Sequence, residues 1–111
     1  MWTVDDRRAW KEANPEKVKA YKRLNRERRT ATKRQYVIDY LGSRSCVDCG
    51  EADPIVLEFD HVRGIKRFRV SAMMVSWCSL DVLIKEIAKC DIRCANCHRR
   101  KHSKAQGWYK Q

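Results

Sequence analysis

The chain has 111 residues, and 25 lysines and arginines against 14 aspartates and glutamates give it a formal net charge of +11. This charge predicts binding to a polyanion, because cations placed against phosphates release condensed counterions. Nucleic acid is the leading candidate. An anionic membrane is the competing one, but a membrane-surface helix needs a broad apolar face opposite its cations, and the basic stretches have none. We therefore expect a nucleic-acid partner and no membrane.

A domain of this size buries little apolar surface, so a metal site or disulfides are expected to help hold it together. The six cysteines allow two interpretations, namely three disulfides of a secreted mini-protein or the ligands of a metal. The opening residues, MWTVDDRRAW, contain no apolar run typical of a signal peptide, and no membrane-spanning stretch follows. We expect a reducing cytoplasm, where paired CxxC spacings are more often zinc ligands than disulfides.

Residues 1–44 are expected to form a basic helical arm. Residues 5–13 predict a short helix, and Asn14-Pro15 predicts a break followed by the first turn of a second helix, because proline is tolerated there. This second helix is expected to run from residue 15 to residue 41 and to stop at Gly42. Four apolar residues near its end are expected to dock on the rest of the protein: Val37, Ile38, Tyr40 and Leu41.

The middle of this second helix, residues 17–34, is strongly cationic, with Glu27 as its one acidic residue. Such a segment cannot pack a core, so we expect it to be helical only where something docks on it. It is either a solvated helix that aids solubility or an arm that contacts phosphates. The one-sided charge favours the arm, with three candidate contacts: Lys22, Arg26 and Arg29.

Residues 45–111 are expected to form a compact cysteine-rich unit. Residues 46–50, CVDCG, predict a zinc knuckle in which the glycine lets the backbone turn under the metal. A strand is expected over residues 55–59, an amphipathic helix over 79–89, a second strand over 90–94 and a terminal helix over 95–107. Core positions are expected at Phe59, Phe68, Trp77, Leu83 and Ile87, and Cys78 and Cys90 are interpreted as small buried hydrophobes.

The strongest single motif is the set of two CxxC pairs, Cys46, Cys49, Cys94 and Cys97, which predicts one tetrahedral structural zinc site. The span between the pairs is longer than in a simple zinc ribbon, where about 15–20 residues separate them. The extra residues between the pairs must therefore form structure that a simple zinc ribbon does not have. Four thiolates leave no open coordination position, which argues against a zinc hydrolase acting through this site.

The span between the CxxC pairs carries Asp60-His61, and the terminal helix carries His98 and His102. The two helical histidines stand at i and i+4, so they share one face and can point at a common metal. Asp60 offers a hard oxygen ligand suited to a magnesium-like ion. Adjacent strand residues point to opposite sides, so Asp60 can face a metal while His61 faces a water. A hydrolytic site needs those parts.

These motifs, CVDCG, then LEFDHV, then KCDIRCANCHRRK, resemble those of the HNH endonucleases of the ββα-metal (His-Me finger) class, in particular small phage-type members. The resemblance covers about residues 46 to 104. It implies an α+β fold, a zinc-stapled strand–strand–helix unit, that nicks or cleaves DNA with a divalent cation such as Mg²⁺ or Mn²⁺. It also implies His61 as general base, Asp60 and His98 as ligands of the catalytic ion, and four structural cysteines, with His102 a candidate further ligand.

The resemblance also implies candidate partners in phage DNA packaging and, for a phage protein, a host cytoplasm. One position departs from the family pattern. Where the family's central asparagine falls, about nine residues before the last histidine, this chain has Lys89. That asparagine normally helps to fix the loop and the base histidine. Its loss predicts that another group orients His61, either a backbone carbonyl or Asp91.

Each assignment has a plainer alternative. His61 taken alone reads equally well as a satisfied core histidine, but the neighbouring Asp60 and the zinc framework favour catalysis. Five further cations are expected to grip DNA rather than merely to aid solubility: Arg63, Arg99, Arg100, Lys101 and Lys104. For Trp2, Trp10, Tyr21 and Trp108 the sequence leaves base stacking, partner docking and plain exposure open.

Two functions from different classes follow. The first is a metal-dependent DNA endonuclease whose basic arm adds non-specific affinity. The alternative is a non-catalytic zinc-ribbon protein that binds nucleic acid, or an adaptor in a larger complex. A carboxylate, a base and a spare ligand in the order Asp60, His61, His98 favour the endonuclease, because a pure binding ribbon needs none of them. The missing asparagine slightly favours the binder.

Overall fold

The computed structural model describes residues 1–107, so Trp108 lies outside the described part of the chain. The elements in order are α1 (Val4–Ala13), α2 (Pro15–Gly42), a short 3-10 helix (Pro54–Val56), β1 (Leu57–His61), α3 (Val70–Val75), α4 (Leu80–Ile87), β2 (Cys90–Cys94) and α5 (Ala95–Gln106). The two strands form one antiparallel sheet. The fold is therefore a mixed α+β arrangement, as the sequence predicted.

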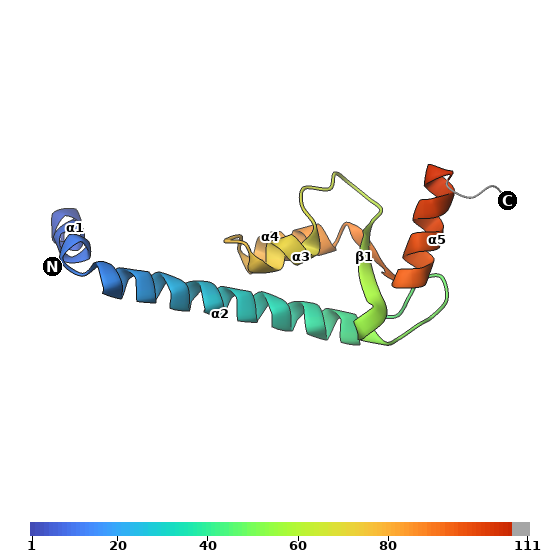
Figure 1. Ribbon diagram of the computed structural model, residues 1–111, viewed down its shortest axis with the longest axis horizontal. Helices are drawn as coiled ribbons and strands as arrows, with labels where there is room; N and C mark the ends of the chain where they lie inside the picture. Colours follow the sequence, from blue (N-terminus) through green and yellow to red (C-terminus); the bar gives the residue numbers. More distant parts are fainter. Residues whose placement is uncertain (108–111) are drawn as a thin grey trace.

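Helix α2 is the long axis of the molecule, which extends 68 Å in its longest direction (Figure 1). Helix α1 lies at one end of α2, and β1 and α5 lie at the other (Figure 1). The start of α1 is capped by Thr3, whose side chain accepts a hydrogen bond from the Asp6 backbone while the Asp6 carboxylate accepts one from the Thr3 backbone. Pro15 opens α2, as the Asn14-Pro15 break predicted.

Helix α2 is continuous for 28 residues, including its exposed cationic middle. The expectation that this segment is helical only where something docks on it was wrong. Lysine and arginine are themselves good helix formers, and the docked end of α2 extends the helix cooperatively toward its exposed part.

One cation of α2, Lys33, is buried, with only 1% of its surface exposed. Its ammonium donates hydrogen bonds to the Met73 carbonyl at 2.6 Å and to the Ser76 carbonyl at 2.7 Å. These carbonyls belong to the last turn of α3 and the residue that follows it, where a cation is favoured by the helix dipole. Lys33 therefore fastens α2 to α3, a role that its cationic neighbours concealed in the sequence.

The core consists of two adjoining clusters. The first gathers around Val37, Val70, Met73, Leu83, Ile87 and Cys90, and the second around Cys46, Leu57, Ile92, Cys94 and Cys97. Tyr40, Leu41 and Phe59 pack against both. The end of α2 thus packs in the same unit as residues 45–107, as the predicted docking of its last apolar residues implied.

Three predicted apolar contacts are wrong. Ile38 is 61% exposed, Phe68 63% and Trp77 86%, so none of them lies in the core. Ile38 follows the buried Val37 and is rotated from it by about 100° around α2, away from the core. The other two residues lie in connecting segments outside the helices. Hydrophobicity alone did not reveal this, because apolar residues are common on folded surfaces. Leu83 and Ile87 are buried as predicted.

The sheet register sets the positions of the candidate site residues. Leu57 pairs with Cys94, Asp60 with Asp91, and His61 with Cys90. Successive strand residues point to opposite faces of a sheet. Glu58 and Asp60 therefore share the face that contacts α5, whereas His61 points to the opposite face, toward α4.

Candidate functional site

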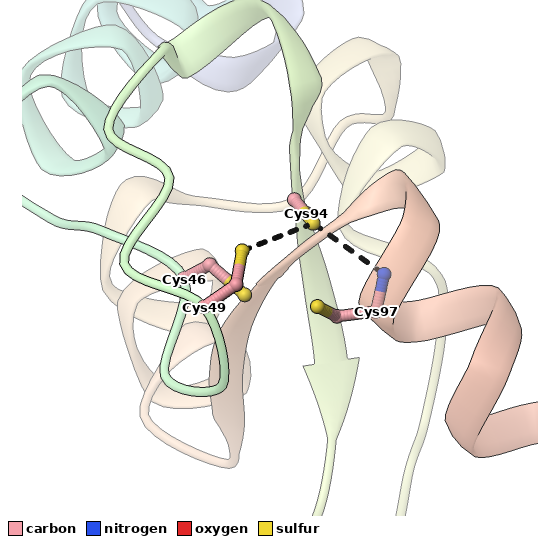
Figure 2. Close-up of side chains that lie close together, drawn as sticks. All are labelled: Cys46, Cys49, Cys94 and Cys97. Carbon is pink, nitrogen blue, oxygen red and sulfur yellow. Dashed lines mark hydrogen bonds between the residues drawn. The ribbon is translucent and has the colours of Figure 1, made fainter.

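The four cysteines of the two CxxC pairs meet in space. Cys46 and Cys49 lie in the turn after α2, Cys94 ends β2, and Cys97 lies in the first turn of α5, with the four thiol groups facing one another (Figure 2). All four sulfur atoms lie within 4.8 Å of one another, and the Cys49 and Cys94 sulfurs are 3.7 Å apart. Tetrahedral ligands about 2.3 Å from a zinc ion would be about 3.8 Å apart. The cluster therefore fits a closed structural zinc site.

The backbone of the first knuckle turns at Gly50, whose φ is +79°. This left-handed conformation favours glycine. The Gly50 amide donates to the Cys46 carbonyl at 2.9 Å, and the Cys46 amide donates to the Glu51 carbonyl at 2.8 Å. In the second knuckle, the Cys97 amide donates to the Cys94 sulfur at 3.4 Å. Local backbone hydrogen bonds therefore help to place the thiols within each knuckle.

The thiols differ in how readily they ionise. Burial raises the pKa of Cys46, but backbone hydrogen bonds from Cys94, Cys49 and Asp48 outweigh it and lower that pKa to about 6. The hydrogen bond with the Cys94 thiol, followed by burial, raises the pKa of Cys97 to about 12. The cluster thus accepts a first negative charge readily and resists further ones. A bound divalent cation would supply the charge that four thiolates require.

Asp60 is the centre of a charged network on the face of β1 that contacts α5. One of its oxygens, Oδ2, accepts hydrogen bonds from Arg93 at 2.5 Å and from Lys101 at 2.6 Å. Burial raises the pKa of Asp60, but the hydrogen bond and charge of Lys101, with His98 and Arg93, lower it on balance. Asp60 is therefore a carboxylate at neutral pH. Its other oxygen, Oδ1, lies 3.6 Å from Nε2 of His98.

The other ring nitrogen of His98, Nδ1, lies 2.9 Å from the Glu58 carboxylate. Because a carboxylate only accepts, Nδ1 must donate, and in a neutral imidazole Nε2 then carries a lone pair directed toward Asp60. Nε2 and Oδ1 are then two acceptors near each other, and a proton on Nε2 or a cation between them would make this approach favourable. Two atoms 3.6 Å apart could both lie about 2.1 Å from one divalent ion.

His61 is oriented by Glu86 of α4, a residue that the sequence reasoning missed. Nε2 of His61 lies 2.9 Å from the Glu86 carboxylate, which is 2% exposed. Glu86 also accepts from the Lys89 ammonium at 2.9 Å and the Arg67 amide at 3.1 Å. Burial raises the pKa of Glu86, but these hydrogen bonds, that of Lys89 first, lower it on balance. An ionised Glu86 makes Nε2 of His61 the donor and leaves the lone pair on Nδ1.

Lys89, at the position where the resemblance led us to look for an asparagine, makes several contacts of its own. Its ammonium donates to the Ile65 carbonyl at 2.7 Å, and its own carbonyl accepts from the Val62 and Arg63 amides. Lys89 thus holds the loop that follows β1. Among residues 1–107, the group that holds the His61 ring is Glu86, not the expected Asp91 or a backbone carbonyl. Asp91 instead forms an ion pair of 2.6 Å with Arg63.

The predicted DNA-contacting cations divide into two groups. Arg63 and Lys101 already bind groups of this chain, since Arg63 donates to the Ala88 and Cys90 carbonyls and Lys101 donates to Asp60. The side chains of both stay about half exposed, at 53% and 47%. The other six are exposed on α2 or α5: Lys22, Arg26, Arg29, Arg99, Arg100 and Lys104. Their contacts with DNA stay predictions.

His98 and His102 line one open cavity of about 600 Å³ together with Glu58, Asn96 and Arg99. Their common face confirms the geometric part of the i, i+4 prediction. Within residues 1–107, however, the four cysteines are the one group of three or more Cys, His, Asp or Glu whose ligand atoms converge. The roles of Asp60, His98 and His102 as metal ligands therefore stay predictions.

Comparisons of the chain with models of known protein families, with curated proteins and with solved structures found no match. Within the described residues, none of the helices combines the length and apolar character needed to cross a membrane.

Proposed function

We propose that this protein is a metal-dependent DNA endonuclease that nicks or cleaves phosphodiester bonds. One observation carries the proposal. His61 and Asp60 are adjacent on β1 and point to opposite faces of the sheet. On one face, the Glu86 carboxylate holds the His61 ring. On the other, Asp60 faces His98, whose ring is oriented by the Glu58 carboxylate. Both arrangements leave a histidine nitrogen with a lone pair available for chemistry, Nδ1 of His61 and Nε2 of His98. The proposal agrees with the resemblance of these motifs to HNH endonucleases.

His61 is the general base in this proposal. Its Nε2–H is committed to Glu86, so Nδ1 is the atom that accepts a proton from the attacking water. As positive charge develops on the ring, the adjacent carboxylate stabilises it. Glu86 therefore acts as a positioning residue that selects the productive tautomer of His61, as a buried carboxylate does in other histidine-based catalytic sites.

Asp60 and His98 would hold the divalent ion, Mg²⁺ or Mn²⁺, through Oδ1 and Nε2. When bound, such an ion polarises a phosphate and stabilises the leaving oxygen. Glu58 supports this role because its hydrogen bond to Nδ1 keeps the lone pair of His98 on Nε2. Exposed cations on the same helix, Arg99, Arg100 and Lys104, would bind the flanking phosphates.

The test is relaxation of supercoiled plasmid by zinc-loaded wild type with added Mg²⁺, with Mn²⁺, or with neither. Omitting the ion is preferable to EDTA, which can also remove structural zinc. We expect nicking that requires the ion and is lost in His98→Ala but retained in the same-helix control Ser103→Ala. A loss in His102→Ala as large as in His98→Ala would make His102 a third ligand. Plasmid binding without nicking under any ion would overturn the proposal.

The non-catalytic alternative has one observation in its favour. Arg93 and Lys101 both bind Oδ2 of Asp60, so the chain itself already neutralises the carboxylate that would bind the ion. In a protein that only binds nucleic acid, this network would simply brace α5 against the sheet. Lys101→Met separates the two functions, because removing the competing ammonium should increase Mn²⁺ affinity in an endonuclease and should leave a binder without any Mn²⁺ site.

A further inference from the structure

The end of the molecule farthest from the sheet contains a cleft between α1 and α2 that neither proposed function uses. Its volume is about 590 Å³. The residues of α1 that line it, Arg7, Trp10 and Lys11, follow the i, i+3, i+4 spacing of one helix face, and Val18, Tyr21 and Lys22 of α2 follow the same spacing. The helix pair therefore presents two matched faces to one opening.

Aromatic rings dominate the apolar part of this cleft. Trp2, Trp10 and Tyr21 all line it, and they are 60%, 40% and 67% exposed. Packing of the two helices against each other therefore leaves these three aromatic side chains exposed to solvent. At this end of the molecule, neither helix contributes a residue to the two core clusters. Exposed aromatic groups gathered in one place mark a binding site more often than scattered surface residues do.

The charged residues that line the cleft are all cations, namely Arg7, Lys11 and Lys22. Among the described residues no aspartate or glutamate lines it. The ligand should therefore combine negative charge with flat apolar groups. Single-stranded nucleic acid has this combination, because its bases can stack on aromatic side chains while a cationic groove follows its phosphates.

We propose that the cleft between α1 and α2 binds unpaired nucleotides of a nucleic acid. Bases stack on Trp2, Trp10 and Tyr21, and the phosphates between them contact Arg7, Lys11 and Lys22. The choice of nucleic acid as the ligand rests on the proposed function. A continuous duplex offers the phosphates but keeps its bases stacked inside, so the aromatic part of the site selects unpaired segments.

The position of the cleft adds a substrate class. From Tyr21 at the cleft to Tyr40 at the core, α2 spans about 28 Å at about 1.5 Å per residue, the length of about eight base pairs. The cationic middle of α2 joins the two places (Figure 1). A nucleic acid in which a duplex of this length adjoins an unpaired segment would engage the whole molecule. The preferred substrates are therefore branched, tailed or gapped DNA.

The test uses the zinc-loaded full chain and fluorescence anisotropy of a labelled oligothymidylate, a tailed duplex and a blunt duplex. We expect Trp10→Leu and Tyr21→Leu each to weaken binding of the oligothymidylate and the tailed duplex at least about fivefold, the lower end of base–aromatic stacking. Blunt-duplex binding should not change. Trp77→Leu is the matched control, because this exposed tryptophan lies in the turn between α3 and α4.

A change on the ligand side removes any dependence on how the variants fold. Wild type should bind an oligomer with abasic sites in place of its central bases more weakly than the intact oligomer, although the phosphates are the same. Equal binding of these two oligomers would overturn the proposal. Displacement of the oligothymidylate by an acidic, phenylalanine-containing peptide as effectively as by unlabelled oligothymidylate would also overturn it, in favour of a protein partner.

These outcomes are separable from failure of the endonuclease proposal. Metal-dependent plasmid nicking by wild type, with unchanged single-strand binding by Trp10→Leu and Tyr21→Leu, would leave the endonuclease intact and overturn the cleft. Loss of single-strand binding in both variants, with no nicking by wild type, would support the cleft and overturn the endonuclease.

Discussion

Glu86→Gln should destabilise this protein strongly, although it preserves the size and shape of the side chain. The buried carboxylate accepts from His61, Lys89 and the Arg67 amide. The carbonyl oxygen of a glutamine can still accept from His61 and the Arg67 amide, which share one oxygen of Glu86. Its NH₂ group would then face the Lys89 ammonium, and two donors cannot bond to each other. Removing one partner of a buried ion pair costs about 3 kcal/mol or more. For a domain of this size that corresponds to a decrease in Tm of about 12 °C.

Denaturant unfolding of the zinc-loaded protein measures this cost, and Glu58→Gln is the matched control. Glu58 also pairs with a histidine, but its side chain is 50% exposed, and exposed pairs contribute about 1 kcal/mol or less. The direction in which this stabilisation changes with pH follows from the lowered pKa of Glu86. Its stabilisation should be complete above its ordinary pKa of 4.5 and should disappear as pH falls through the lower value in the folded protein.

The difference in unfolding free energy between wild type and Glu86→Gln should therefore be constant near neutral pH and should shrink in acid. The same variant should lower any nicking rate by about 10²-fold or more, because the tautomer of His61 is no longer fixed. An unchanged unfolding midpoint would refute the reasoning, since it would mean that Glu86 does not anchor the network.

Three further predictions address the zinc, the buried lysine and the arm. Cys97→Ser should release the metal and leave the chain largely unfolded by circular dichroism, because zinc binding of about 10 kcal/mol or more rivals the stability of the whole domain; cooperative folding without metal would contradict this. Lys33→Ala should lower unfolding free energy by about 2 kcal/mol or more by leaving two carbonyls without their donor, whereas Arg34→Ala, an exposed neighbour, should change it little. Replacing Arg26 and Arg29 together by glutamine should reduce the slope of log affinity against log salt for duplex DNA by about two times 0.9, and an unchanged slope would exclude these side chains as phosphate contacts.

Local signals made most of the secondary structure predictable. The break at Asn14-Pro15, the glycine that follows Cys49 and the apolar spacing around Leu83 act within a few residues of one another. The two CxxC pairs lie far apart in sequence, but their tetrahedral chemistry restricts them to one arrangement, and the structure brings all four sulfurs together. Coordination chemistry therefore made this long-range contact predictable.

Other long-range contacts had no comparable signature. Lys33 lies in a run of exposed cations, and only its contacts with the end of α3 distinguish it from them. Glu86 had a weak signal, because it is a carboxylate beside Ile87 on the buried face of an amphipathic helix. Glu58 also had one, because it lies two residues before Asp60 on a strand and therefore on the same face. A charged residue at an apolar position was thus the most informative feature that the sequence reasoning overlooked.

Lys89 and Glu86 together fix the loop that follows β1 and the imidazole of His61. Lys89 fastens the loop through Ile65, and Glu86 orients the histidine. The two residues are also paired with each other at 2.9 Å. A fixed loop and a fixed imidazole are thus provided here by two side chains, one from the end of α4 and one from the turn that follows it.

The most direct test of the endonuclease proposal is the single-turnover nicking rate of zinc-loaded wild type and His61→Ala on supercoiled plasmid with Mn²⁺. Zinc content and plasmid affinity are measured for both proteins. Loss of the general base should lower the rate by about 10²-fold or more while zinc content and affinity stay the same. Equal nicking by the two proteins, or none by wild type that binds zinc and plasmid normally, would contradict the assignment of His61 as the catalytic base.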